Sequence, residues 1–122
     1  MRRIMTTLSM GAAAILLYPP LPVAAAAHSR EPETLAVGKE IAFNSKKGNC
    51  LACHAIADGV SPGTIGPPLI NMKARFPSLA ALRDQIWDPT KRNPDSPMPP
   101  FGKHRILSAD EIDKVAAFIW SQ

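Results

Sequence analysis

The sequence contains no block of like charges and no basic stripe interleaved with aromatic side chains. Its net charge of +4 includes Arg2 and Arg3, and residues 28–122 alone carry twelve basic and ten acidic residues, a net charge of +2. A protein that binds a polyanion needs a stronger and more localised positive field than this. We therefore expect no nucleic-acid partner.

The sequence also shows no sustained alternation of apolar and polar residues, the pattern of a half-buried strand. Thirteen prolines and seven glycines leave little room for long regular elements. A domain of this size buries only about 60–68% of its unfolded surface, and small domains usually need a covalent or metal staple. The pattern predicts one all-α domain of three to five short helices with long Pro/Gly-rich loops.

The first 27 residues have the pattern of a cleavable signal peptide. Two arginines precede an apolar stretch that ends at Pro19, and Ala25 and Ala27 provide the small residues that a signal peptidase requires. The stretch is shorter than the roughly 20 apolar residues of a spanning helix, although an uncleaved anchor is the alternative. We expect residues 28–122 to be a periplasmic domain with no membrane attachment after cleavage.

Four helices are indicated, and His28–Pro32 is expected to be a loose lead-in to the first. Ser108 and Glu111 form the pattern of a capping box at the start of the last helix. Gly38, inside the first helix, suggests either a close backbone neighbour or a tolerated surface glycine. The expected helices begin near Thr34, cover Cys50–Ala57, run from Ser78 with Leu79, Leu82 and Ile86 as the apolar stripe, and begin again at Ser108.

The only two cysteines lie three residues apart in G-N-C-L-A-C-H-A, and His54 follows directly. A thioredoxin-like dithiol would need a βαβ frame, a disulfide this short would stabilise little, and a zinc site would have to recruit His28 and His104 at an unfamiliar spacing. Covalent haem explains all three residues, because one helical turn presents Cys50 and Cys53 to the haem vinyl groups and His54 to the iron. We expect one covalently bound haem c, which also acts as the staple.

Met98 is the preferred candidate for the second axial ligand. It lies in N-P-D-S-P-M-P-P-F-G, where the prolines on both sides restrict the backbone, and it is not on the apolar stripe of a helix where a core methionine is usually found. Met72 is expected to pack in the core, and His104 is expected at the surface. The other ring nitrogen of His54 needs an acceptor, and a proline carbonyl in the rigid segment G-P-P-L (residues 66–69) is suited to that role, with an ordinary turn as the alternative.

The order of these features resembles class I cytochromes c over nearly all of residues 28–122. The features are the glycine of the first helix, C-x-x-C-H, G-P-P-L, the Met98 segment and an aliphatic last helix. This resemblance implies a class I cytochrome c fold in which Gly38 crosses the final helix near Phe118 or Trp120. It also implies that Pro67 accepts a hydrogen bond from His54.

Three sequence segments narrow the resemblance to one group of cytochromes c. F-P-S-L-A-A-L-R-D-Q-I-W-D-P-T, N-P-D-S-P-M-P-P-F-G and L-S-A-D-E-I-D-K-V-A-A-F are similar to SoxX, the small monohaem subunit of the sulfur-oxidising SoxAX complex. That resemblance implies a larger haem subunit, SoxA, as partner and the oxidative linkage of thiosulfate to a cysteine of a SoxYZ-type carrier protein. It further implies electron delivery to a downstream soluble cytochrome c.

No side chain is placed in the sequence as an acid, base or nucleophile for sulfur chemistry. Any L-cysteine S-thiosulfotransferase activity would therefore belong to the complex rather than to this chain alone. Two alternatives stay open: a free-standing electron shuttle serving an oxidase, and a small haem peroxidase or sensor with an open sixth site. The residues around the cysteines, Leu51, Ala52, Ala55 and Ile56, fit either an apolar docking face or the core.

Overall fold

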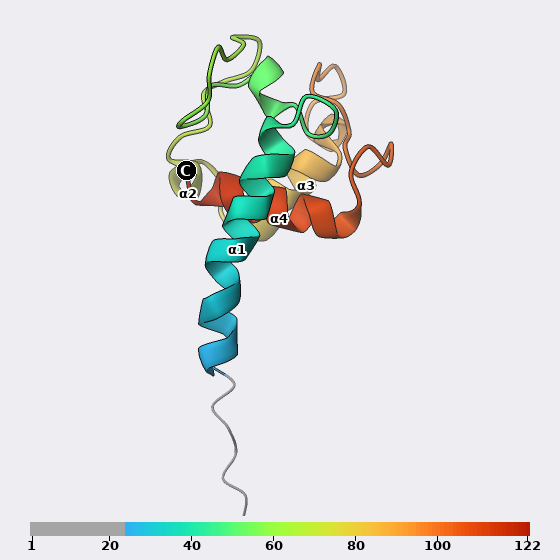
Figure 1. The fold of residues 1–122 in the computed structure, drawn as a ribbon. Helices are drawn as coiled ribbons and strands as arrows, with labels where there is room; N and C mark the ends of the chain where they lie inside the picture. The colour runs from blue at the N-terminus through green and yellow to red at the C-terminus, as the bar shows by residue number, and fades with distance from the viewer. Residues whose placement is uncertain (1–23) are drawn as a thin grey trace, which may run out of the picture.

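A computed structural model describes residues 24–122, and in this range the chain has four α-helices, two short 3₁₀ turns and no strand (Figure 1). The expected all-α class is confirmed. None of the helices in this range combines the length and apolar character needed to cross a membrane. Residues 1–23 of the expected signal peptide lie outside the described residues. The elements are α1 (Ala24–Phe43), η1 (Cys50–Ala52), α2 (Met72–Arg75), α3 (Leu79–Trp87), η2 (Pro89–Lys91) and α4 (Ala109–Trp120).

The backbones of α1 and α4 approach closely where the two helices cross (Figure 1). A Cβ atom on Gly38 would lie 2.1 Å from the carbonyl oxygen of Lys114 and 2.9 Å from Cβ of Phe118. The glycine inside the first helix is therefore required by the approach of α4, and the expected contact with Phe118 is confirmed. The ring of Phe43 extends the crossing, because it packs edge-on against Phe118 with the ring centroids 6.0 Å apart.

Gly38→Ala is expected to lower the free energy of unfolding by about 3 kcal/mol, since overpacking typically costs about 1–3 kcal/mol and a helix carbonyl yields less readily than the end of a side chain. Denaturant unfolding of the holoprotein, followed by circular dichroism, measures this change. Ala36→Ser, on the exposed side of the same helix, is the control and should change stability by no more than about 0.5 kcal/mol. Equal unfolding midpoints for Gly38→Ala and the unaltered protein would contradict the close crossing.

The last two long helices begin as their capping residues predict. Ser108 Oγ accepts from the amide of Glu111 at 3.2 Å while a Glu111 carboxylate oxygen accepts from the amide of Ser108 at 2.9 Å, so the capping box of α4 is confirmed. Ser78 Oγ accepts from the amide of Ala81 and starts α3. The core contains these side chains of the two helices: Leu82, Ile86, Ile112, Val115, Ala116, Phe118 and Ile119. Leu79, expected on the same stripe, is 41% exposed.

The first helix begins ten residues earlier than Thr34, so the expectation of a loose lead-in over His28–Pro32 is wrong. A proline inside a helix costs about 3 kcal/mol, so Pro32 locally opposes this extension of the helix. The alanine run before it and the glutamates beside it favour the helix, and Thr34 Oγ1 donates to the carbonyl oxygen of Arg30 at 2.8 Å. The first half of α1 projects from the rest of the molecule, and Arg30–Glu33 are exposed (Figure 1).

The helix expected over Cys50–Ala57 is reduced to one turn, η1, followed by irregular backbone. An α-helix would need the carbonyl groups of this segment for amides four residues further on. The loop that follows η1 folds back and donates hydrogen bonds to those carbonyl groups instead, and this ends the helix early. Three of its amides donate at 2.8 Å each: Gly63 to Leu51, Gly66 to Cys53 and Leu69 to Ala55.

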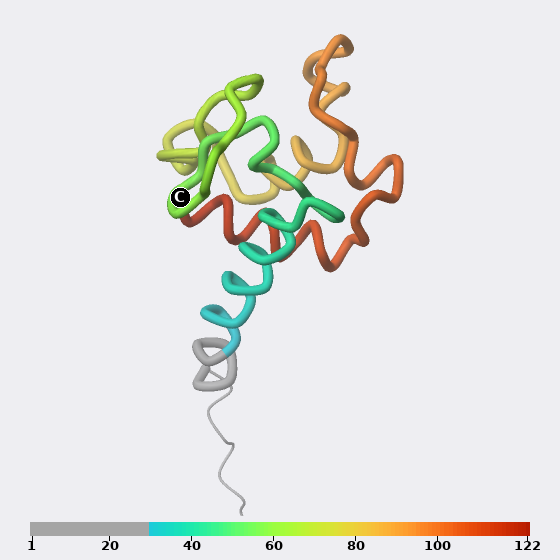
Figure 2. Tube along the Cα trace, turned by 45° about the horizontal axis from the view of Figure 1, so that its top comes forward, coloured from blue at the N-terminus to red at the C-terminus, as the bar shows by residue number. Residues whose placement is uncertain are grey.

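Two long loops lie on the same side of the helices (Figure 1). One follows η1 and extends to residue 71, and the other joins α3 to α4. Figure 2 shows the same arrangement in a view turned by 45°. The part of the second loop formed by residues 88–102 carries Met98 and is termed the Met98 loop. The two loops bring the expected site residues to one region of the molecule, although these residues are far apart in the sequence.

Candidate functional site

A cavity of about 570 Å³ lies between the two loops and the helices beneath them. This volume is within the range of about 300–1,000 Å³ typical of ligand and cofactor sites. Most of its wall is apolar, so it suits a largely apolar occupant. The wall includes Cys50, Cys53, His54 and Met98 together with side chains of α3 and α4, among them Leu82, Ile86, Val115 and Ile119.

The two cysteines reach the cavity from a single helical turn. The amides of Cys53 and His54 both donate to the carbonyl oxygen of Cys50, at 3.2 and 2.9 Å, and this places the thiols and the imidazole on one wall. Both sulfur atoms are free, so the short disulfide is not formed. Burial raises the pKa of the Cys50 thiol to about 11. A redox-active dithiol needs a lowered pKa, so this environment disfavours thioredoxin-like chemistry.

The imidazole of His54 is held between a carbonyl group and a glycine. Its Nδ1 lies 2.7 Å from the carbonyl oxygen of Pro67. Because a carbonyl can only accept, Nδ1 carries a proton, and in the neutral imidazole the lone pair is then on Nε2, which is the tautomer of a histidine that binds a metal through Nε2. Gly66 lies against the ring, since a Cβ atom there would be 2.3 Å from Cε1 of His54. The G-P-P-L segment thus fixes both the tautomer and the orientation of the ring.

The structure separates the three candidates for a second axial ligand. Met98 is half-buried on the cavity wall, and His104 is exposed on a turn that does not line the cavity. Met72 also borders the cavity, but it is the first residue of α2 and is only 1% exposed, as expected of a core side chain. Cys50, Cys53, His54 and Met98 are therefore brought together, with Met72 as the remaining sulfur donor nearby.

Arg75 is a site residue that was not singled out from the sequence. Arg75 lines the cavity, and its guanidinium donates through Nη1 to the carbonyl oxygen of Pro68 at 2.6 Å. A cation on an apolar wall is suited to a carboxylate of the occupant. The bond to Pro68 also steadies the segment that orients His54. Nothing in the local sequence marks this arginine, because a surface arginine seven residues after Pro68 fits no recognisable motif.

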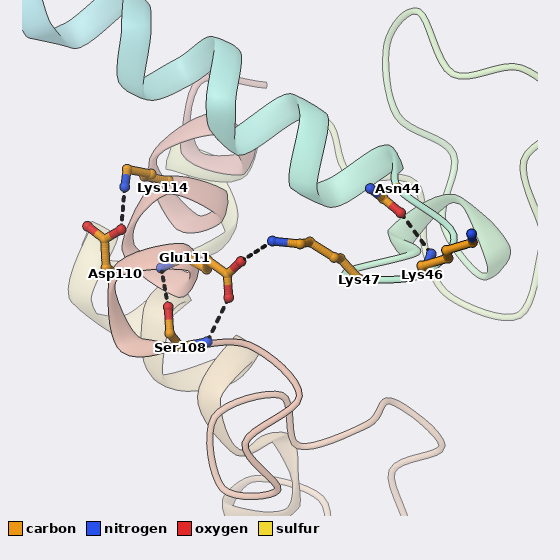
Figure 3. A network of polar contacts seen from close by, with 7 residues as sticks. All are labelled: Asn44, Lys46, Lys47, Ser108, Asp110, Glu111 and Lys114. Carbon is orange, nitrogen blue, oxygen red and sulfur yellow. Dashed lines mark hydrogen bonds and ion pairs between the residues drawn. The ribbon is translucent and has the colours of Figure 1, made fainter.

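The turn before Cys50 is tied to the start of α4, as Figure 3 shows. Lys47 Nζ forms an ion pair with the Glu111 carboxylate, which is also the acceptor of the capping box at Ser108. The hydrogen bond from Lys47 holds the pKa of the Glu111 carboxyl below its usual value. Within the same turn, the amide of Lys46 donates to Asn44 Oδ1 at 2.9 Å. These contacts position the chain where it enters the C-x-x-C-H turn.

The apolar residues around the cysteines divide between core and surface. Ile56 is buried and belongs to the core, whereas Ala52 is exposed.

The zinc alternative requires about four ligands. In residues 24–122 no group of three or more histidine, cysteine, aspartate or glutamate side chains is arranged to hold a metal ion.

Residues 34–119 match the model of the family described as cytochrome C oxidase, cbb3-type, subunit III. The chain belongs to this family of cytochrome c domains. It also matches an "Uncharacterized lipoprotein" of Aquifex aeolicus (strain VF5) with 34% identity over 76 residues. This match covers 62% of the chain and 37% of the relative, so the chain spans little more than a third of the relative's length.

The cytochrome c domain holds one covalently bound haem c, and the cavity fits that group. Cys50 and Cys53 supply the C-x-x-C pair for two thioether bonds. The proton on Nδ1 of His54 leaves Nε2 available to iron, and the apolar wall suits a porphyrin. A bound haem c supplies reversible one-electron oxidation and reduction, which makes this domain an electron-transfer protein.

Proposed function

We propose that this cytochrome c domain is the electron-accepting small subunit of a thiosulfate-oxidising complex of the SoxAX type. The observation that carries the proposal is the similarity to SoxX of the three sequence segments quoted above, which lie between Phe76 and Phe118. In the fold these segments form α3, the Met98 loop and α4, and all three border the cavity. The similarity therefore concerns the surroundings of the cofactor rather than a distant surface.

In this proposal His54 and Met98 are the axial ligands of the haem iron. Support comes from their common cavity and from the bond between His54 Nδ1 and the Pro67 carbonyl. With both axial positions taken, no substrate can bind to the iron. The chain then relays electrons, and the chemistry on thiosulfate belongs to a larger haem subunit and a SoxYZ-type carrier protein.

The proposal places the protein in the periplasm as residues 28–122. Support comes from the signal-peptide pattern and from the relative, whose printed name is that of a lipoprotein. Cleavage after Ala27 would fall within α1 as the structure describes it. Residues from His28 onward would then form the first turns of a projecting helix.

The proposed role predicts that purified holoprotein stays oxidised when it is mixed with thiosulfate alone. It should become reduced when the SoxA-type subunit and the carrier protein are also present, and the two cytochromes should co-purify. Visible absorbance measures the reduction. The control is a carrier protein in which serine replaces the acceptor cysteine, since this change should prevent reduction. Rapid reduction of the isolated chain by thiosulfate would contradict the proposal and favour an enzyme with an open iron site.

A second candidate is electron transfer to or within a terminal oxidase. The observation that favours it is the description of the matching family as a subunit of cbb3-type cytochrome c oxidase. This function predicts association with an oxidase and oxidation of the reduced chain by that oxidase. Co-purification with an oxidase, without a second sulfur-oxidising cytochrome, would replace the thiosulfate role by this one.

A further inference from the structure

Asp88 is the buried charged side chain whose role the cofactor site does not explain. It is only 6% exposed and lies between α3 and η2, outside the wall of the cavity. A buried carboxylate is costly unless it is paired and hydrogen-bonded. Its partners therefore indicate what the fold uses it for.

The partners of Asp88 come from both ends of the Met98 loop. Oδ1 accepts from the amide of Thr90 at 3.2 Å and from the Thr90 hydroxyl, and Oδ2 lies 3.2 Å from Nζ of Lys103. The hydrogen bond from the Thr90 side chain, reinforced by Lys103, holds the pKa of the Asp88 carboxyl below its usual value. Asp88 is the first residue of the loop and Lys103 directly follows its last.

The backbone closes the loop at the same place. The carbonyl oxygen of Trp87 accepts from the amides of both Gly102 and Lys103, at 3.1 and 3.2 Å. The loop thus leaves α3 and returns to it within a few ångströms. The Asp88–Lys103 ion pair lies beside this closure and joins the two ends of the Met98 loop through their side chains.

Met98 itself is not held to the helices by backbone hydrogen bonds in the described part of the chain. Its amide donates to Ser96 Oγ at 3.3 Å, within the loop, and prolines occupy both neighbouring positions. A rigid proline-rich segment keeps its shape, but its position relative to the cavity is set where it is attached. That attachment is the closure at Trp87, Asp88 and Lys103.

We propose that the Asp88–Lys103 ion pair clasps the base of the Met98 loop and thereby holds the Met98 thioether at the cavity. The clasp rests on the proposed ligation by Met98. Asp88 and Lys103 are positioning residues, since neither borders the cavity. Loosening the clasp allows the loop to move away and increases the fraction of molecules in which the sixth position is open.

The test uses ferric holoprotein with Asp88→Asn and, separately, Lys103→Gln. The methionine-to-iron charge-transfer band should weaken, and the affinity for added imidazole should rise by about fivefold in Asp88→Asn and by about twofold in Lys103→Gln. These values are the fold-changes expected when about 0.5–1 kcal/mol of ion-pair energy is lost. The effect of the double variant on the free energy of imidazole binding should be smaller than the sum of the two separate effects, because the two residues share one interaction.

Asp58→Asn is the matched control, because Asp58 also forms an ion pair, with Lys39 at 2.8 Å, but on a different loop. It should leave the band and the imidazole affinity unchanged. The clasp is overturned if Asp88→Asn lowers only the unfolding midpoint, since this is the result of a merely structural role. If Asp88→Asn yields no holoprotein, Lys103→Gln decides, because Lys103 is exposed and substitution of an exposed side chain is expected to leave the fold intact.

The clasp and the thiosulfate role fail in different experiments. Both clasp readouts use the isolated holoprotein, so the absence of thiosulfate-dependent reduction with the partners present would leave the clasp in place. Persistence of the charge-transfer band in Met98→Ala would overturn the clasp together with Met98 ligation. An unchanged imidazole affinity in both clasp variants, with the band lost in Met98→Ala, would overturn the clasp alone.

Discussion

Replacing both Cys50 and Cys53 by alanine is expected to abolish covalent haem attachment and, with it, the stable fold. The variant should lose all haem on denaturation, because only the two thioether bonds retain the group in an unfolded chain. Acid-acetone extraction followed by intact-mass measurement reports this directly. The unaltered protein should keep the mass of one haem, and the same measurement should show a chain that begins near His28.

The expected loss of stability follows from the size of the cavity. Without haem, the mostly apolar wall of a cavity of about 570 Å³ would face water, and the free energy gained by covering it with the cofactor, roughly 25 cal/mol per Å² of apolar surface, would be lost. The chain without haem should therefore collapse or unfold rather than keep this cavity. Loss of the cooperative thermal transition in circular dichroism measures that outcome.

Controls for the cysteine variant lie within the same turn. Cys50→Ala alone should keep the haem on Cys53 through one thioether bond, and Ala52→Ser, at an exposed position, should attach haem normally. A double-alanine variant that retained haem after extraction would show that attachment occurs elsewhere. A double variant that remained fully folded without haem would contradict the role of the cofactor as half of the core.

Met98→Ala is expected to remove the ferric methionine-to-iron charge-transfer band and to open the iron to added imidazole. Its reduction potential should fall, because methionine ligation raises the potential of a haem. The unfolding free energy should change less than for Met72→Ala, since Met98 is half-buried and Met72 fully buried. Visible spectroscopy of the holoprotein measures the band and the binding of imidazole, and redox titration measures the reduction potential.

Met72 provides the matched control, because it is the other sulfur donor at the cavity. Met72→Leu conserves volume and should cost less than about 1.5 kcal/mol while leaving the band intact. Met72→Ala should destabilise the protein by about 2–5 kcal/mol, again without loss of the band. The ligand assignment is wrong if the band survives in Met98→Ala and disappears in Met72→Leu.

Features that depend on neighbours within a few residues were predictable from the sequence. The capping box at Ser108 and Glu111 and the single turn that presents Cys50, Cys53 and His54 are set by hydrogen bonds between residues three or four apart. The placement of Met98 outside a helix follows from its flanking prolines in the same way. These local constraints also identify the cofactor, because the chemistry of C-x-x-C-H is contained in five consecutive residues.

The length of a helix was decided by contacts that the sequence does not mark. The turn at Cys50 ends early because amides returning from residues 63–69 take its carbonyl groups. The first helix continues back past Pro32, where a local cost is outweighed by the alanines and glutamates around it. Periodicity reports neither effect, since it records which residues are apolar and not which carbonyl groups are already bonded.

The supports of the site were decided by the tertiary structure alone. Arg75 reaches Pro68, Lys47 reaches Glu111 and Asp88 reaches Lys103, and the last two pairs are separated by 64 and 15 residues in the sequence. Arg75 reaches a backbone carbonyl, and the other two pairs consist of ordinary charged residues whose local surroundings suggest a solvated surface. Only the folding of two loops around one cavity brings these charges within hydrogen-bond distance, because at such separations the whole core, including the crossing of α1 and α4 at Gly38, sets where each loop returns.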